Sequence, residues 1–354
     1  MLRIYNLPKE NRSTHAAILK SHGFDSIVLG PDETPDSIQP ALSQNLKVWS
    51  CRPAFSIRHH PPSEQTPLLA RDVDHHPQLW FNSGCPNQPA LRQAHRQHVQ
   101  EIAQGPFTGF MLDGIRFASP NSGPAFFTCF CDVCRQAAHA LNLDFDAMRH
   151  AVRALRDQLR PTRPTPDALI ESFQRDPGLT AWLRFRTGCI IGHVHEVRRL
   201  VDDANKWRRQ RSQAPFQLGA YLFAPSLAAL VGQNYAALAG LLDVVSPMLY
   251  RTLTPGDACL TTEYAALANL RLIPPHPEFT PADIAAEVRR ARDLLSQSHA
   301  TPQLVPILQL ADDLGVEVTA AAQAAAPDGL DYFIYRPDTA HYLDTISLGT
   351  RASI

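Results

Sequence analysis

Eight short apolar runs recur along the 354-residue sequence, and stretches with helical spacing separate them. The runs are almost continuously hydrophobic, which is typical of strands that are covered on both faces of a sheet. Eight strands that alternate with helices predict an α/β protein with a (β/α)8 TIM barrel. A doubly wound open sheet is the competing architecture, but the Gly-x-Gly-x-x-Gly pattern of a dinucleotide fold does not follow the first run. The runs are residues 2–7, 26–30, 47–55, 107–117, 216–223, 243–250, 303–310 and 330–335.

Two long intervals interrupt the alternation of strands and helices. Residues 56–89 form a loop rich in His and Pro after the third run, and residues from about 118 to 212 form a helical insertion after the fourth. A loop of such length inside a compact domain is usually functional. Because 354 residues fit one large α/β barrel, we expect a single domain over residues 1–354.

The charge balance bears on the classes of partner. The chain has 33 Lys and Arg against 34 Asp and Glu, which gives no electrostatic support for binding nucleic acid. It has no apolar run of the roughly 18 residues that a membrane span needs, and the N-terminus lacks the apolar segment of a secretory signal. We therefore expect a cytoplasmic protein without a membrane or nucleic-acid partner. Assembly into a homo-oligomer stays open.

A Cys-x-Cys-x-x-Cys cluster at Cys129, Cys131 and Cys134 comes shortly after the fourth run. Closely spaced thiols in a cytoplasmic chain indicate metal ligands more often than disulfides. A closed structural Zn²⁺ site needs a fourth ligand, and Cys85 can supply it because loops after neighbouring strands emerge on the same rim of a barrel. Four thiolates leave no open position on the metal, so it would stabilise the rim rather than activate water.

Two other interpretations of the cysteine cluster stay open. It is either a chance grouping of reduced thiols or a redox site with a labile pair of Cys131 and Cys134. Metal analysis distinguishes these from a zinc site. The remaining cysteines lie in apolar surroundings and are expected to be small buried side chains: Cys51, Cys189 and Cys259.

The order of motifs around the cluster resembles the glycoside hydrolase family 42 β-galactosidases. Cys-Pro-Asn-x-Pro at 85–89 is followed by a helix, by a strand that ends near Asp113, and then by the Cys-x-Cys-x-x-Cys motif. Members of this family bind zinc with four cysteines in this arrangement, so the resemblance implies a zinc-binding barrel that acts on a carbohydrate. The resemblance covers residues from 85 to about 145. Residues 182–201 and 243–251 are similar, more weakly, to glycosyl hydrolases of the wider barrel superfamily.

The catalytic glutamates of that family are not matched. The family has an acid/base Glu at the end of strand 4 and a nucleophilic Glu at the end of strand 7. The corresponding places here read Asp113-Gly114-Ile115 and Gln309-Leu310. The resemblance therefore implies a role for the four cysteines as zinc ligands. It does not indicate which residues of this chain would replace the two catalytic glutamates.

Asp113 is the strongest candidate for chemistry, because active sites in such barrels lie at the carboxyl ends of the strands. An ionised carboxylate among apolar residues is costly unless it is paired or used. The positive charge of Arg116, three residues on, would keep the carboxylate of Asp113 ionised, as a nucleophile or a stabiliser of positive charge requires. The alternative is that the two residues form a structural ion pair at the rim of the barrel. Glycoside hydrolysis normally needs a second carboxyl group, and we predict Asp312, with Asp32 and Glu33 as alternatives.

Other polar residues at strand ends are candidates for substrate binding, together with Arg116. They are Arg52, Tyr221, Tyr250, Arg251, Gln309 and Tyr335. The leading hypothesis is a glycoside hydrolase-like barrel with a structural zinc. The alternative is a non-catalytic carbohydrate-binding barrel, in which Gln309 replaces an acid.

Overall fold

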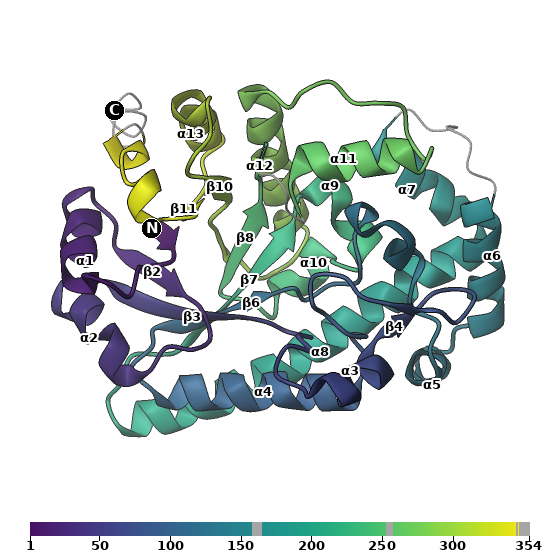
Figure 1. The fold of residues 1–354 in the computed structure, drawn as a ribbon, viewed down its shortest axis with the longest axis horizontal. Coiled ribbons are helices and arrows are strands. Elements are labelled where there is room, and N and C mark those ends of the chain that lie inside the picture. The colour runs from purple at the N-terminus through teal and green to yellow at the C-terminus, as the bar shows by residue number, and fades with distance from the viewer. Residues whose placement is uncertain (158–164, 253–257, 345, 347–354) are drawn as a thin grey trace.

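A computed structural model describes residues 1–157, 165–252, 258–344 and 346 of the chain (Figure 1). The strands are β1 (Leu2–Tyr5), β2 (Ser26–Leu29), β3 (Lys47–Pro53), β4 (Ala70–Arg71), β5 (Pro77–Gln78), β6 (Gly109–Asp113), β7 (Gln217–Phe223), β8 (Val244–Met248), β9 (Gln303–Leu304), β10 (Ile307–Gln309) and β11 (Leu330–Phe333). β4 and β5 form a separate antiparallel pair in the loop after β3.

The other strands form a closed parallel barrel. Their order is β10-β11-β1-β2-β3-β6-β7-β8-β9, and β10 also pairs with β8 through Ile307 and Met248. β9 and β10 follow each other closely and act as two segments of one barrel strand, so eight strands surround the axis. The predicted (β/α)8 TIM barrel is confirmed.

Helices surround the barrel, and Figure 1 shows α4 and α8 running along one side of it. The α-helices are α1 (Arg12–Ser21), α2 (Pro35–Ser43), α3 (Pro62–Leu68), α4 (Pro89–Gln104), α5 (Asp132–Ala140), α6 (Phe145–Asp157), α7 (Pro166–Arg175), α8 (Pro177–Gln210), α9 (Pro225–Ala228), α10 (Tyr235–Ala239), α11 (Leu260–Asn269), α12 (Pro281–Ser296) and α13 (Gly315–Ala324). Three 3-10 helices are η1 (Pro120–Phe127), η2 (Ala229–Val231) and η3 (Pro337–Thr339).

Proline explains where many of these helices begin. Helices α2, α3, α4, α7, α8, α9 and α12 have Pro in the first turn, where its missing N–H costs no hydrogen bond and its fixed φ suits the helix. Thr34 and Ser37 form a reciprocal capping box at the start of α2, and Thr280 and Asp283 do so at α12.

The interval between β6 and β7 contains η1 and the helices α5 to α8. α8 is 34 residues long and packs against α4, α6 and α7. Residues 158–164 of this interval lie outside the described residues. The segment directly after β6 therefore leaves the barrel and returns to it through α8.

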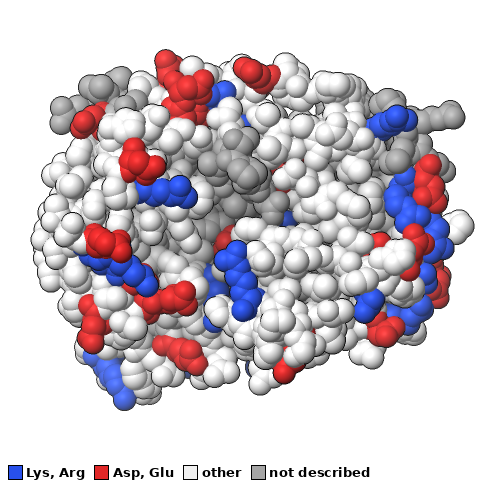
Figure 2. All heavy atoms as spheres, in the orientation of Figure 1, with Lys and Arg blue, Asp and Glu red and all other residues white. Residues whose placement is uncertain are grey.

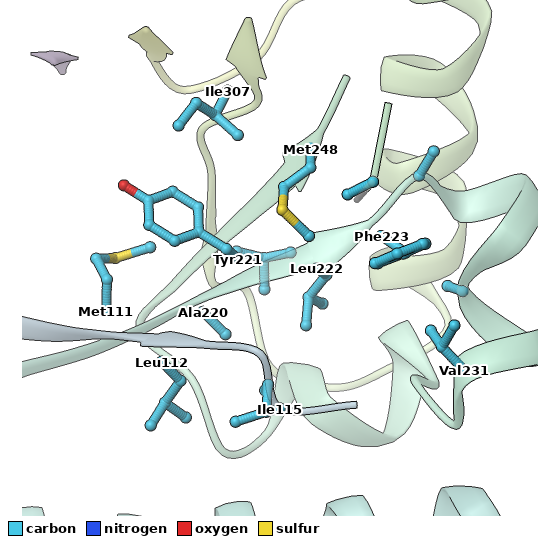
Figure 3. Packing of buried hydrophobic residues seen from close by; sticks show 14 of the residues in the cluster. Met111, Leu112, Ile115, Ala220, Tyr221, Leu222, Phe223, Val231, Met248 and Ile307 are labelled. Atoms are coloured by element: carbon cyan, nitrogen blue, oxygen red, sulfur yellow. The ribbon is translucent and has the colours of Figure 1, made fainter. Parts of the chain in front are cut away.

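The barrel interior contains a buried polar layer beneath its mouth. Arg3 Nε donates to Asp331 Oδ2 at 2.8 Å, and Arg3 Nη2 donates to Ser246 Oγ at 2.8 Å. The Tyr221 hydroxyl donates to the same Asp331 oxygen at 3.0 Å. Figure 3 shows Tyr221 together with Met111, Met248 and Ile307, whose apolar side chains fill the barrel around this layer. Because both charges of the ion pair are fully buried, these hydrogen bonds are needed to offset the cost of desolvation.

Acidic and basic side chains are interspersed over the face of the molecule shown in Figure 2. This mixture agrees with the net charge of -1. None of the helices in the described part of the chain has the length and the apolar character that a membrane span requires.

Candidate functional site

A cavity of about 410 Å³ lies at the carboxyl ends of the barrel strands. Each of the eight barrel strands, or the loop that follows it, contributes to the lining, and the loop after β3 contributes four further residues. The position is the one in which barrels of this class bind their substrates. The lining residues are Tyr5, Pro31, Asp32, Arg52, Pro53, Ser56, Arg58, His59, Phe81, Asp113, Tyr221, Met248, Tyr250, Ile307 and Phe333.

Asp113 is the last residue of β6, in register with Pro53 of β3. Its Oδ1 accepts the backbone N–H of Gly114 at 2.8 Å. Gly114 has φ +58°, a left-handed conformation that favours glycine and turns the chain sharply at the rim. The sequence therefore ends the strand at the acid and leaves the carboxylate in the cavity lining.

Two phenols share the cavity with this carboxylate. Burial raises the pKa of Tyr250, and the negative charge of Asp113 raises it further. Burial also raises the pKa of Tyr5, with smaller contributions from Cys51 and Asp113. Both hydroxyls therefore stay protonated at neutral pH and can donate hydrogen bonds to a ligand or to a carboxylate.

Arg116 lies behind the rim and outside the cavity lining. Its guanidinium is 4.6 Å from the ring centroid of Trp80, 5.4 Å from that of Phe81 and 4.7 Å from that of Phe223. Only 2% of Arg116 is exposed. The predicted influence of Arg116 on Asp113 stays a prediction, whereas its observed contacts stabilise the aromatic wall that includes Phe81.

The structure places Asp312 in an ion pair rather than in the cavity lining. Arg251 Nη2 lies 2.6 Å from Asp312 Oδ1, and Arg251 Nε donates to Asp312 Oδ2 at 3.2 Å. Both side chains are buried, and Arg251 also pairs with the exposed Asp313. Among the described residues, the carboxylate that lines the cavity together with Asp113 is Asp32, an alternative named from the sequence.

The predicted binding residues divide into two groups. Arg52, Tyr221 and Tyr250 line the cavity. Gln309 instead donates to the Ala311 carbonyl at 2.6 Å, and the buried Tyr335 shares a hydrogen bond of 2.7 Å with His15 Nδ1.

Sequence reasoning missed several lining residues. The argument that selected Tyr221 would also have found Tyr5 and Phe333, because each of the three lies two residues before the end of its predicted run. Arg58 and His59 lie in the long loop after β3, and no local pattern in the sequence indicates which loop residues turn towards the cavity.

The four predicted cysteines converge, as the sequence indicated. Their Sγ atoms all lie within 4.8 Å of one another, and all four side chains are buried. Cys85 Sγ is 3.4 Å from Cys134 Sγ, 3.4 Å from Cys129 Sγ and 3.6 Å from Cys131 Sγ. Four sulfurs bound tetrahedrally at about 2.3 Å from a metal would be about 3.8 Å apart, close to these separations.

Asn87 and α5 fix this cluster in place. The Asn87 side chain donates to Cys134 Sγ and to Cys189 Sγ at 3.2 Å each, and its backbone N–H donates to Cys85 Sγ at 3.4 Å. Cys131 is the N-cap residue of α5, and Cys134 lies in the first turn. N–H donors of this kind stabilise the thiolate form of a ligand.

A buried arginine next to the cluster supports negative charge on it. Arg186 is fully buried and donates to the carbonyl oxygens of Thr128 (2.6 Å) and Leu230 (2.5 Å). Among the described residues it has no carboxylate partner. Burial lowers the pKa of Arg186 well below its ordinary value, and negative charge on Cys129 and Cys134 would partly offset this. Four thiolates around a divalent cation have a net negative charge, and the residues present therefore fit a metal.

Comparison with solved structures identifies the same fold in several proteins. A β-galactosidase from the Antarctic haloarchaeon Halorubrum lacusprofundi matches with a TM-score of 0.64 and 13% identity, over 99% of this chain and 58% of that chain. A catalytic mutant of a GH42 β-galactosidase from G. stearothermophilus matches with a TM-score of 0.60 and 13% identity, over 99% and 56%. The catalytic domain of a β-amylase from Paenibacillus polymyxa matches with a TM-score of 0.59 and 10% identity, over 99% and 98%.

These likenesses show the fold that the chain shares with glycoside hydrolase barrels. The chain spans 58% and 60% of the first two β-galactosidase chains that it matches. No protein-family model matches the sequence. No curated protein matches it either. The fold and the site thus define a (β/α)8 barrel with an acid-bearing cavity and an adjacent four-cysteine cluster.

Proposed function

We propose that this protein is a glycoside hydrolase-like barrel that acts on a carbohydrate bound in the cavity at the strand ends. The observation that carries the proposal is that Asp113 ends β6 and lines a cavity of about 410 Å³ together with several aromatic side chains. A cavity of this size suits a small ligand, and aromatic faces suit the apolar faces of sugar rings. The named activities of the structural neighbours, β-galactosidase and β-amylase, support the same class of substrate.

In this proposal Asp113 stabilises or attacks the anomeric carbon of the sugar. Its carboxylate is suited to the oxocarbenium-like transition state of glycoside hydrolysis, and Tyr5 and Tyr250 donate hydrogen bonds beside it. Asp32 is the second carboxyl group that the cavity offers, in the role of acid or base. Asp312 stays a candidate for that role, although its ion pair with Arg251 occupies both of its oxygens.

The experiment is turnover of a panel of aryl glycosides by the parent protein and by single amide variants. Asp113→Asn should lower kcat by about 10²–10⁴-fold, the range for removing a positioned acid or base. Asp32→Asn should lower kcat by a similar factor if Asp32 is the second catalytic carboxyl group. In that case Asp312→Asn serves as the control. A loss of turnover in Asp312→Asn that is not matched in Asp32→Asn would restore Asp312 as the second acid.

A non-catalytic carbohydrate-binding barrel is the second candidate function. The residue that favours it is Gln309, which stands where the resemblance to the family 42 enzymes implies an acid and whose side chain is hydrogen-bonded to Thr252 and Ala311. This alternative predicts saturable binding of a sugar but no turnover of any aryl glycoside by the parent protein.

We also propose that Cys85, Cys129, Cys131 and Cys134 hold one structural Zn²⁺. The all-thiolate donor set and the sulfur separations support zinc, and the buried Arg186 would offset part of the charge. The metal would connect the loop after β3 to the segment after β6, two rim segments that flank Asp113. One zinc per chain in metal analysis is the expected result, whereas a chain without metal and with an exchangeable disulfide would favour the redox alternative.

A further inference from the structure

The β3 side of the cavity has an arginine that forms no ion pair with the carboxylates around it. Arg52 lies near the end of β3, lines the cavity and is half-buried. Among the described residues it takes part in no hydrogen bond or ion pair. A guanidinium in such a position has lost part of its water without gaining a protein acceptor, which is costly unless a ligand supplies one.

Other buried arginines of this protein have acceptors. Arg3 binds Asp331, Arg12 binds Glu33, and Arg251 binds Asp312. Arg208, which has no carboxylate, donates to three backbone carbonyl oxygens. Each of these arginines thus has at least one protein acceptor, whereas Arg52, which lines the cavity, has none among the described residues.

Two more nitrogen-bearing side chains line the same side of the cavity. Arg58 and His59 come from the loop that follows β3. With its amide oriented so that the oxygen faces Arg58, Asn82 accepts from Arg58 Nε at 3.2 Å and from Arg58 Nη2 at 2.7 Å. A neutral amide positions this guanidinium but leaves its charge uncompensated.

The carboxylates near Arg52 act on it through their charge without forming an ion pair with it. Burial lowers the pKa of Arg52, and the charges of Asp32 and Glu101 raise it, although neither forms an ion pair with it. The charge of Asp113 acts instead on Tyr5, Cys51 and Tyr250. The cavity thus has two arginines at β3 and its following loop, with Asp32 after β2 and Asp113 at the end of β6 on either side of β3, and phenols at β1 and β8.

We propose that Arg52 and Arg58 form a subsite for an anionic group of the carbohydrate, so that the ligand is a sugar bearing a carboxylate or a phosphate. This inference rests on the proposed function, because it places the sugar in the same cavity. The planar guanidinium fork matches both carboxylate and phosphate oxygens in a bidentate way. The anionic group would lie against β3 and direct the anomeric carbon towards Asp113.

The test is calorimetric binding of matched ligand pairs to the full chain. The pairs are methyl β-D-glucuronide with methyl β-D-glucoside, methyl β-D-galacturonide with methyl β-D-galactoside, and the 6-phosphates of glucose and galactose with the free sugars. We expect the anionic member of at least one pair to bind about 10-fold or more tightly, as charged hydrogen bonds predict. The carboxylate and phosphate arms distinguish the two sources of charge, and inorganic phosphate alone reports anion binding without a sugar.

Variants assign the preference to its residues. Arg52→Gln should remove the preference for the anionic member, Arg52→Lys should keep part of it, and Arg58→Gln should reduce it independently. Arg290→Gln on α12 is the matched control, because Arg290 is also half-buried but pairs with Asp167 away from the cavity. Circular dichroism and thermal unfolding establish that each variant folds, and Arg58→Gln keeps the test decisive if Arg52→Gln does not.

The possible results separate this inference from the proposed function. If neutral and anionic sugars bind equally, the subsite is wrong and the carbohydrate-binding function stands. If Arg52→Gln slows turnover of both ligand types equally without changing the preference, Arg52 orients Asp32 and the inference is overturned. If no sugar of either type binds or is turned over, the proposed function and the subsite both fail.

Discussion

On the β3–β6 side of the barrel mouth Arg52 and Asp113 line the cavity, whereas on the β8–β10 side Arg251 and Asp312 bind each other. Both sides have an acid and an arginine at strand ends, so residue type does not distinguish them. The difference is whether the charges neutralise each other inside the protein. The β8–β10 pair stabilises the rim, whereas Arg52 on the β3–β6 side forms no ion pair among the described residues and can bind a charged ligand.

Loss of the proposed Zn²⁺ should have the largest effect, because it would remove a link between the loop after β3 and the segment after β6. We expect Cys85→Ser, or chelation of the parent protein, to abolish zinc binding and to lower the unfolding temperature. Structural zinc contributes roughly 10–16 kcal/mol in small zinc-finger peptides, and the effect here is expected to be a fraction of that because a large core remains. Metal analysis and thermal unfolding are the measurements.

The matched control for the metal is Cys259→Ser, which changes a buried thiol outside the cluster. It should keep the full zinc content. Equal stability of the parent protein with and without a chelator would show that the four cysteines do not hold a structural metal.

Removal of one partner from the β8–β10 pair should be costly for folding. Asp312→Ala leaves Arg251 buried without its bidentate acceptor, and breaking a buried pair typically costs about 3–5 kcal/mol. We expect the lower end of this range, because Asp313 also contacts Arg251. Asp113→Asn should cost less, because the amide keeps its shape and its oxygen can still accept from Gly114.

Urea unfolding of the two variants measures this difference. If Asp113→Asn destabilises the protein as much as Asp312→Ala does, the contrast between the two sides of the rim is not real. Asp113 would then be a structural residue like Asp312.

A cluster of histidines between α4 and α8 differs from both sides of the barrel mouth, because burial keeps these titratable side chains neutral. His95 Nδ1 lies 2.9 Å from His193 Nε2, and His98 packs nearby against Phe110, as His95 does. Burial lowers the pKa of His95 to about 3 and that of His98 to about 4, and it lowers the pKa of His193 as well.

The sign of the pH dependence follows from these depressed values. The contribution of these neutral histidines to the free energy of unfolding is fully present above about pH 6.5, the pKa of histidine in the unfolded chain. It is lost as the pH falls towards 3–4, the range of the depressed pKa values in the folded protein. Between pH 7.5 and 5 each such histidine should cost about 2 kcal/mol of unfolding free energy. Buried carboxyl groups with raised pKa act in the opposite direction: Asp331, Glu263 and Glu287.

Comparison of the parent protein with His95→Gln isolates the histidine contribution, because the carboxyl groups are common to both. We expect urea unfolding at pH 7.5 and 5 to show a smaller loss of stability in the variant. An unchanged loss would mean that His95 is not held neutral by burial.

The sequence predicts the properties of this architecture that follow from local patterns and strand order. It does not predict those that follow from the direction in which a side chain points. Strand order follows from the alternation of runs and helices, and the closeness of Cys85 to Cys129 follows from strand order. The position of Asp113 at a strand end is local as well. These features could therefore be predicted without coordinates.

Partner choice among side chains could not be predicted in the same way. Arg251 and Asp312 come from adjacent barrel strands, but nothing in either segment shows that they turn towards each other rather than into the cavity. The pair of Arg3 and Asp331 is separated by 328 positions and lies in mid-strand, where the strand-end argument does not look. Tyr335 follows the end of β11, and its hydroxyl shares a hydrogen bond with His15, a partner that its place near a strand end does not indicate.

The smallest expected effect on ligand affinity concerns two tyrosines, Tyr250 and Tyr335, which the sequence predicts to bind substrate for the same reason. Tyr250 lines the cavity beside Asp113, whereas the Tyr335 hydroxyl shares a hydrogen bond with His15 away from the cavity lining. Removal of one neutral hydrogen bond to a ligand costs about 0.5–1.5 kcal/mol, so Tyr250→Phe should weaken sugar binding by about 2- to 10-fold. Tyr335→Phe should leave affinity unchanged and lower only the unfolding free energy by a similar amount. If calorimetry shows that the two variants lose affinity equally, the ligand does not distinguish the cavity from the rest of the rim, and the assignment of the binding site to this cavity is wrong.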